Sequence, residues 1–231
     1  MAHEIFDKAV DAGQRLRDEC DAAGSVLDDP RAAVSPEAAL ARLTEGNARY
    51  VAGASRGADH AAGRVERARG QAPFAALVSC ADSRVAPELA FDEPPGALFV
   101  CRLAGNLVNA DVLASLEYAV TFLGTSLIVV LGHSGCGAVD AAIRVAETAE
   151  VLPGNLDQMA VSILPAVTRA QRAGLGDAGA LLDAVIAENA RLSAQRITSR
   201  SATLAEAVEA GRLAVRAAVY EISSGEVRFL D

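Results

Sequence analysis

Short apolar runs alternate with helical patterns through the middle and the end of the chain. Runs at 75–79, 97–102 and 126–132 are largely apolar and are bounded by glycine, proline or polar residues, which is typical of buried parallel strands. Later runs at 213–222 and 227–230 flank a Ser-Ser-Gly turn and predict a fourth strand followed by an antiparallel edge strand. The pattern therefore predicts an α/β fold, with a central, mostly parallel sheet of four strands plus an antiparallel edge strand, flanked by helices.

Helical periodicity fills the segments between these runs. Ser35, Pro36 and Glu37 form a strong helix start, because serine caps a helix, proline suits its first position and glutamate complements its dipole. That helix is expected to end near Tyr50. The other helices are predicted over 109–124, from Gly137 onward, over 156–172 and over 178–196.

The chain is expected to form one domain over 1–231, with an N-terminal helical arm over 1–34. No internal repeat, low-complexity block or long linker divides the sequence. Within the arm, residues 3–22 carry an imperfect apolar stripe at helical spacing, and Asp-Asp-Pro at 28–30 closes that segment.

Composition and charge exclude several classes of partner. The formal net charge is −9 and Lys8 is the only lysine, so a basic footprint for nucleic acid or anionic lipid is missing. The longest apolar run, at 127–131, is far shorter than the roughly 20 residues of a membrane-spanning helix, and the first residues lack the pattern of an export signal. We therefore expect a cytoplasmic protein. Its four cysteines are too few for a disulfide scaffold, which favours a metal site.

Most of the reactive side chains follow the predicted strands, and a site is expected where the carboxyl ends of parallel strands meet. Cys80 follows the first strand, Arg102 and Asn106 the second, and His133 and Cys136 the third. Two thiolates and one imidazole select zinc, and three protein ligands leave one tetrahedral position open, as in catalytic zinc sites. Alternatively, Cys136 is a small buried apolar residue and His133 a hydrogen-bonded core residue.

Asp82 and Arg84 add a carboxylate and a cation close to the first cysteine. If Arg84 pairs with Asp82, the carboxylate stays off the metal and can accept a hydrogen bond from a zinc-bound hydroxide. Without Arg84, Asp82 could itself occupy the fourth position. The plainer alternative is a surface ion pair of small energetic value.

Four motifs together resemble the β-class carbonic anhydrases, most densely over residues 36–145. They are CADSRV at 80–85, RLAGN at 102–106, SLEYAV at 115–120 and GHSGCGAV at 132–139. The resemblance implies that Cys80, His133 and Cys136 bind one Zn²⁺ per chain and that Asp82 with Arg84 forms a catalytic dyad.

The same resemblance implies a substrate-binding wall made of Gln71, Phe99 and Tyr118. Gln71 lies nine positions before Cys80, Phe99 lies nineteen after it, and Tyr118 falls in the predicted helix between the second and third strands. In the family the glutamine hydrogen-bonds the substrate and the two aromatic residues shape an apolar pocket at a subunit interface, so a homodimer or a dimer-based tetramer is implied. Each residue also has a plain structural explanation, since Phe99 is in a strand, Tyr118 on a helix and Gln71 in a polar loop.

The function implied is the reversible hydration of CO2 to bicarbonate and a proton by zinc-bound hydroxide. Zinc lowers the pKa of its bound water toward about 7, an effect whose standard example is itself a carbonic anhydrase. Leu77 stands where some members carry a tryptophan that helps bicarbonate close the site, so we expect an open site with Asp82 off the metal. The alternatives are hydrolysis of COS or CS2 on the same scaffold, or a non-catalytic zinc-binding interaction domain.

Two features depart from the family pattern or fall outside it. The segment FDEPPGALFV at 91–100 carries two prolines where the family has a Gly-rich turn, so the approach to the second strand is expected to be reshaped. Cys20 and Cys101 match no ligand role, and Cys101 is expected to be a core thiol.

Overall fold

The computed structural model of the chain describes residues 34–57, 61, 63–172 and 178–230. The expected N-terminal arm lies outside these described residues, and so does Cys20. Val34–Asp231 forms one compact unit. Its strands are β1 (Ala75–Ser79), β2 (Leu98–Arg102), β3 (Leu127–His133), β4 (Ala214–Tyr220) and β5 (Val227–Leu230).

The five strands form one sheet in the order β2-β1-β3-β4-β5. The first four are parallel to their neighbours, and β5 pairs antiparallel with β4. This arrangement confirms the predicted fold class. In the register, Ser79 of β1 is opposite both Arg102 of β2 and Leu131 of β3, so the carboxyl ends of these strands lie at one edge of the sheet.

Helices cover both faces of this sheet, and most of them lie where the periodicity predicts. Ser35 caps the first one, since its side chain accepts a hydrogen bond from the Ala38 N–H. The helices are α2 (Pro36–Val51), α3 (Arg64–Arg67), α4 (Pro87–Ala90), the 3₁₀ turn η2 (Ala104–Asn106), α5 (Ala110–Leu123), α6 (Gly137–Thr148), α7 (Leu156–Gln171), α8 (Ala178–Arg200) and α9 (Ala202–Glu209).

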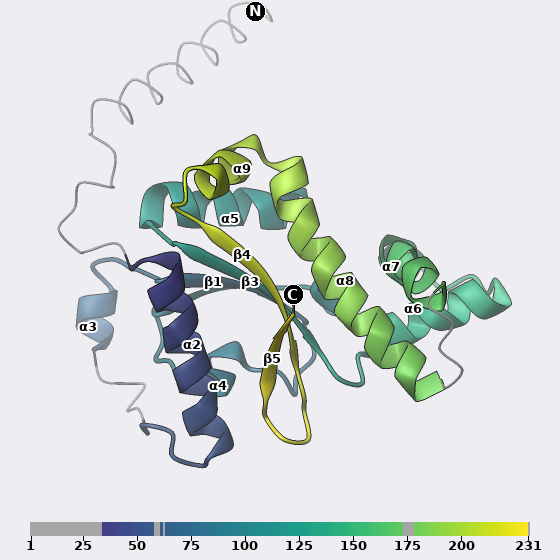
Figure 1. Cartoon of the computed structure of the whole chain (residues 1–231), viewed down its shortest axis with the longest axis horizontal. Coiled ribbons are helices and arrows are strands. Elements are labelled where there is room, and N and C mark those ends of the chain that lie inside the picture. Colours follow the sequence, from purple (N-terminus) through teal and green to yellow (C-terminus); the bar gives the residue numbers. More distant parts are fainter. Residues whose placement is uncertain (1–33, 58–60, 62, 173–177, 231) are drawn as a thin grey trace, which may run out of the picture. The chain divides into compact units, whose positions relative to one another are not determined.

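The central strands are buried on both sides, which explains their nearly continuous apolar sequences. Every residue of β1 and β3 is buried. One face packs against α5, α8 and α9, and the other packs against α2 and α4. Figure 1 shows α2 and α4 on one side of the strands and α8 on the other. A third apolar cluster joins α6, α7 and α8 beside Cys80 and Cys136.

The structure corrects several boundaries near the carboxyl end. Helix α8 continues to Arg200, four residues beyond the predicted end, and α9 follows where no helix was predicted. Ser201 allows this change of direction because its side chain caps α9 by accepting a hydrogen bond from Leu204 N–H. Strand β4 ends at Tyr220, because Glu221 already belongs to the turn: its N–H donates to Glu226 O.

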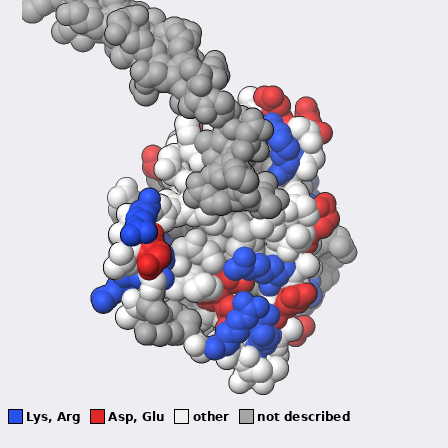
Figure 2. Space-filling model, turned by 90° about the vertical axis from the view of Figure 1, so that its left-hand side faces the viewer, with Lys and Arg blue, Asp and Glu red and all other residues white. Residues whose placement is uncertain are grey.

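Basic and acidic side chains are intermixed on the surface. On the face drawn in Figure 2, arginine and acidic side chains lie next to one another. On helix α2, Arg42 pairs with Glu93 and Arg49 pairs with Asp92. Among the described residues, no helix is both long and apolar enough to cross a membrane.

Asn47 of α2 joins three parts of the fold through one buried amide. Its Nδ2 donates to Ala90 O at 2.9 Å and to Gly225 O at 2.8 Å, and its Oδ1 accepts from Val227 N at 2.8 Å. The side chain is only 6% exposed. Helix α2 is therefore held to the end of α4 and to the β4–β5 hairpin by hydrogen bonds of a buried side chain.

We predict that Asn47→Ala lowers the free energy of unfolding by about 2–4 kcal/mol, because it leaves two carbonyls and one N–H buried without partners. Urea unfolding followed by circular dichroism measures the change. The matched control is Thr44→Ala, an exposed position of the same helix, where we expect a change within about 0.5 kcal/mol. Equal losses in the two variants would contradict this role for Asn47.

Candidate metal centre

Three potential metal ligands meet at the carboxyl ends of β1 and β3. Cys80 directly follows β1, His133 is the last residue of β3, and Cys136 is the N-cap of α6. One ligand atom from each lies within 4.8 Å of the other two, and the two sulfur atoms are 4.0 Å apart. All three residues are buried. The structure thus brings together the three side chains that the sequence places at separate junctions.

The turn between His133 and Cys136 depends on glycine. Gly135 has φ of +64°, a left-handed conformation that favours glycine, and it brings the chain from the end of β3 to the start of α6 within three residues. The Cys136 carbonyl then accepts hydrogen bonds from Val139 N and Asp140 N, which begins the helix. This geometry points the histidine and cysteine of the His-x-x-Cys motif at the same place.

Hydrogen bonds and burial make the two thiols unequal. The pKa of Cys80 is lowered to about 3, chiefly by a hydrogen bond with Cys136, with further contributions from His133 and from the backbone N–H groups of Asp82 and Gly105, against the opposing effect of burial. The pKa of Cys136 is raised by the neighbouring Cys80 thiolate and by burial. Without a cation the pair is therefore one thiolate and one thiol, and a bound metal ion is what would allow both sulfur atoms to ionise.

One ring nitrogen of His133 has a hydrogen-bond partner, and the other has none. Its Nδ1 lies 3.0 Å from Ser134 O, where it can donate, and this selects the tautomer with a lone pair on Nε2. Nε2 is buried and has no hydrogen-bond partner. Burial lowers the pKa of His133, but Cys80, the Ser134 carbonyl and Asp82 together outweigh this effect and raise it overall.

The donor set fits zinc. Tetrahedral zinc with Zn–S bonds of about 2.3 Å places two sulfur ligands about 3.8 Å apart, close to the 4.0 Å separation of the sulfur atoms of Cys80 and Cys136. A buried imidazole nitrogen without a partner and two thiols at this spacing are what such an ion requires. Three protein ligands leave the fourth position for water or substrate.

Asp82 and Arg84 pair beside the three ligands. Arg84 Nε donates to Asp82 Oδ1 at 3.0 Å and Nη2 donates to Oδ2 at 2.7 Å, while the Arg84 N–H also reaches Oδ1 at 2.9 Å. These hydrogen bonds hold the pKa of Asp82 well below its usual range. Asp82 Oδ2 lies 3.9 Å from His133 Nε2, so the carboxylate faces the cluster while it remains bound to arginine.

Two arginine side chains also hold this loop by donating to backbone carbonyls, and the sequence did not predict these hydrogen bonds. Arg84 Nη2 also donates to Gly135 O at 3.2 Å, which ties the dyad to the turn between His133 and Cys136. Arg102 donates from Nε to Cys80 O at 3.0 Å and from Nη2 to Asp82 O at 2.6 Å. Arg102, the last residue of β2, was the signal in the sequence, but the sequence does not reveal that its partners are backbone carbonyls.

Gly105 contacts the cluster through its backbone, a contact that the sequence did not predict. Its backbone N–H donates to Cys80 Sγ at 3.3 Å, and this N–H is one of the groups that lower the thiol pKa. Gly105 has φ of +71° within η2, and a Cβ built on it would lie 2.9 Å from Ile163 Cδ1. Both observations require glycine at this position, and the glycine of the RLAGN motif is the corresponding signal in the sequence.

The predicted substrate wall is only partly assembled within one chain. Phe99 of β2 and Tyr118 of α5 lie side by side, with ring centroids 6.5 Å apart, and Phe122 stacks beyond Tyr118 at 5.5 Å. Tyr118 and Phe122 are 47% and 46% exposed. Gln71 is exposed just before β1, and among the described residues it forms no hydrogen bond with the three ligands.

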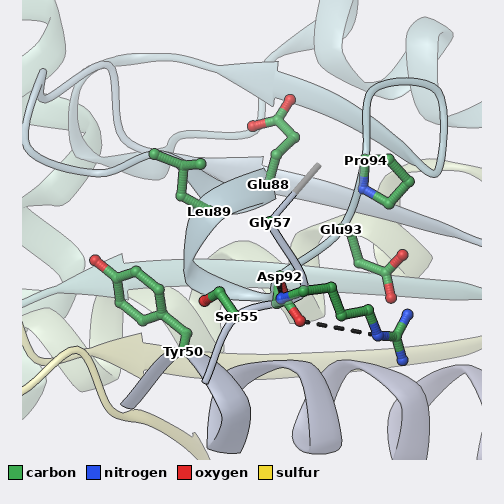
Figure 3. Close-up of a pocket in the computed structure, with 9 residues that line it drawn as sticks. Tyr50, Ser55, Gly57, Glu88, Leu89, Asp92, Glu93 and Pro94 are labelled. Atoms are coloured by element: carbon green, nitrogen blue, oxygen red, sulfur yellow. Dashed lines mark hydrogen bonds and ion pairs between the residues drawn. The ribbon is translucent and has the colours of Figure 1, made fainter. Parts of the chain in front are cut away.

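The segment at 91–100 shapes a separate cleft of about 310 Å³. Phe91 is fully buried and Asp92 has φ of +48°, so the chain turns sharply before β2. Figure 3 shows Tyr50, Leu89 and Pro94 among the side chains around the cleft, which none of the three ligand candidates lines. Cys101 is half-buried on β2, and burial raises its pKa.

The comparison of sequences identifies relatives over most of the chain. A family model described as carbonic anhydrase matches residues 75–227. Carbonic anhydrase 2 of Mycobacterium tuberculosis is 37% identical over 201 residues, which cover 85% of this chain and 94% of that protein. A carbonic anhydrase of Pseudomonas aeruginosa is 39% identical over 178 residues, which cover 70% of this chain and 74% of that protein.

Solved structures agree with the sequence comparison. The β-carbonic anhydrase CcaA superposes with a TM-score of 0.68 at 27% identity, covering 83% of this chain and 87% of that one. A Coccomyxa β-carbonic anhydrase in complex with acetazolamide gives 0.64 at 25% identity, covering 96% and 85%. Fold and relatives together identify an enzyme of the carbonic anhydrase class. The chain belongs to the carbonic anhydrase family, in its β class.

Proposed function

We propose that this chain is a zinc-dependent carbonic anhydrase in which Cys80, His133 and Cys136 hold one zinc ion per chain. The observation that carries the proposal is the meeting of three buried ligand atoms within 4.8 Å of one another. His133 Nε2 is buried there without a partner. A purely structural role would leave this nitrogen uncompensated, whereas a metal ion satisfies it.

Zinc held by Cys80, His133 and Cys136 would make a coordinated water acidic near neutral pH, the effect best known from carbonic anhydrases themselves. Asp82 supplies the next requirement, because its Oδ2 faces the cluster from 3.9 Å away from His133 Nε2. That oxygen can accept a hydrogen bond from the attacking water and so aim its lone pair at the carbon of CO2. Carbon dioxide and water then give bicarbonate and one proton, which leaves to solvent.

Arg84 holds Asp82 in the ionised state that this hydrogen bond requires. The two guanidinium hydrogen bonds occupy both carboxylate oxygens, so Asp82 stays ionised and is drawn away from the fourth ligand position. Leu77, buried in β1, stands where a tryptophan would be needed for closure by bicarbonate. We propose that the site is open at neutral pH and has no tryptophan-based bicarbonate switch.

We further propose that the enzyme is a homodimer, which can pair again into a tetramer, and that Gln71, Phe99 and Tyr118 form the substrate wall of a site shared between subunits. Strand β2 is an edge of the sheet, so its outer side has no neighbouring strand within the described chain. Tyr118 and Phe122 expose nearly half of their large aromatic surfaces beside it. An interface through this edge would bury them.

A charged residue at this edge should separate the subunits. We predict that Phe122→Asp shifts the protein from dimer or tetramer to monomer and weakens self-association by at least about 100-fold, because a carboxylate would be buried against an apolar surface. Sedimentation velocity measures the change. Val151→Asp is the matched control, since Val151 is 85% exposed and lies elsewhere. A wild-type protein that is monomeric, or a Phe122→Asp variant that assembles like the control, would contradict the interface.

The remaining assignments follow from charge and organisation. We propose a single carbonic anhydrase domain preceded by the N-terminal arm, which the match of the family model to 75–227 supports. The net charge of −9 and the single lysine support the absence of nucleic acid and anionic membrane partners. We propose that the enzyme is cytoplasmic. Its small-molecule partners are CO2 and bicarbonate.

The test of this function uses the purified wild-type protein. Zinc is measured by elemental analysis, and CO2 hydration is followed by stopped flow with a pH indicator. We expect about one zinc per chain and rapid hydration that a chelator removes and added zinc restores. A folded protein without zinc, or a zinc-loaded protein that releases sulfide from COS or CS2 but does not hydrate CO2, would overturn the proposal.

A further inference from the structure

Helix α8 buries one amide side chain in an otherwise mostly apolar face. Asn189 is 3% exposed. The buried residues of this face are Val185, Ile186, Ala187, Asn189, Ala190, Ser193 and Ile197. An amide at such a position is destabilising unless its polar atoms are bonded. Asn189 Nδ2 donates to Gly105 O at 2.8 Å, across 84 residues of sequence.

Gly105 is bound on both sides of its Cα. Its N–H donates to Cys80 Sγ at 3.3 Å, while its carbonyl accepts the hydrogen bond from Asn189. Gly105 also has a left-handed conformation, with φ of +71° and ψ of +21°, within the three-residue turn η2. The turn has one backbone hydrogen bond of its own, from Asn106 N to Leu103 O at 2.9 Å. The bond from Asn189 holds the peptide that follows Gly105 and so adds a second restraint on the place of the Gly105 N–H.

The same helix lies against the strand that carries His133. A Cβ built on Gly132 would lie 3.3 Å from Ile186 Cγ2 and 3.7 Å from Ala190 Cβ, so α8 packs closely against the end of β3. Asn189 lies between Ile186 and Ala190 in the sequence. Helix α8 thus packs against the strand that carries His133, and it also binds the carbonyl of the glycine whose N–H donates to Cys80 Sγ.

We propose that Asn189 is a positioning residue for the metal centre: by holding the Gly105 carbonyl, it directs the Gly105 N–H at Cys80 Sγ and sets the donor strength of that sulfur. The inference rests on the proposed zinc function. An N–H···S hydrogen bond draws electron density from a thiolate, so its loss changes the metal–sulfur bond and frees the loop that supplies it.

The test compares Asn189→Ala with Ser193→Ala. Ser193 lies one turn further along the same buried face of α8, so both variants replace a buried polar side chain with alanine. We expect Asn189→Ala to raise the zinc dissociation constant about 10–100-fold, the usual effect of losing a group that orients a ligand. A chromogenic chelator measures it. Cobalt(II) replaces zinc as a spectroscopic probe, and the thiolate-to-cobalt absorption band should shift in Asn189→Ala alone.

A milder variant keeps the test valid if Asn189→Ala does not fold. In Asn189→Thr the hydroxyl can bond to the carbonyl one turn earlier in its own helix, which leaves Gly105 O without its partner while the volume of the side chain stays nearly the same. The same rise in dissociation constant and the same band shift are expected. Unchanged values in a folded Asn189 variant, or equal changes in Ser193→Ala, would overturn the inference. If wild-type protein binds neither zinc nor cobalt, it is the proposed function that fails.

Discussion

Cys80→Ser should give a folded protein that contains almost no zinc and hydrates CO2 at least about a thousand-fold more slowly. Serine keeps the shape of the side chain, but its hydroxyl does not ionise near neutral pH and offers a hard oxygen in place of a soft thiolate. One of three ligands is then missing, and Cys136 and His133 alone form an incomplete site. We expect zinc to fall from about one to below about 0.1 per chain.

Elemental analysis after gel filtration and stopped-flow hydration measure the two effects on the same sample. Cys101→Ser is the matched control, because Cys101 is a half-buried cysteine on β2 whose side chain is not one of the three grouped ligands. It should retain zinc and activity. Thermal unfolding of both variants verifies that they are folded. If Cys80→Ser keeps wild-type zinc content, then Cys80 is not a ligand and the metal centre has been assigned to the wrong side chains.

The sheet and the ligand cluster could be predicted from the sequence because both depend on local signals. Strands β1 and β3 are buried on both faces, so their sequences are continuous apolar runs in which polar residues do not alternate with apolar ones. Parallel strands then bring their carboxyl ends to one edge, and the pairing of β1 with β3 places Cys80 beside His133. His133 and Cys136 are neighbours through a single glycine turn.

What could not be predicted depends on contacts between distant segments. Asn189 looks like any polar residue within a helical pattern, and only the tertiary structure brings it 2.8 Å from Gly105 O. The partners of Arg102 are backbone carbonyls, which have no sequence signature. Helix α9 was missed because the pattern around it is short, although Ser201 carries a cap signal.

The substrate wall could not be derived from the sequence pattern for a different reason. The spacing of Gln71, Phe99 and Tyr118 comes from the family resemblance, which implies that a site is completed by a second subunit. One chain places Phe99 beside Tyr118 but leaves Tyr118 47% exposed. A wall that forms only across an interface cannot be read from the contacts of a single chain, and so it stays a prediction for the oligomer.

Asp82→Asn should keep zinc and lose turnover by about 100- to 10,000-fold, the usual range for removal of a group that moves or orients a proton. Asparagine has the same shape, so the three ligands are undisturbed and zinc content should stay at the wild-type level. It carries no charge, however, and it cannot form two charge-assisted hydrogen bonds to Arg84 as Asp82 does at 3.0 Å and 2.7 Å. The oxygen facing the cluster then becomes a weak acceptor or is replaced by an amide donor.

Zinc content and kcat measured together separate this outcome from that of Cys80→Ser, where both are lost. Asp157→Asn is the control, since Asp157 is an acidic residue in the first turn of α7 and should tolerate the change. The role proposed for Asp82 requires that Asp82→Asn lose turnover while it keeps its zinc. If the variant turns over CO2 as fast as Asp157→Asn, the pair with Arg84 is a surface ion pair only, and the proton must be handled by other groups around the metal.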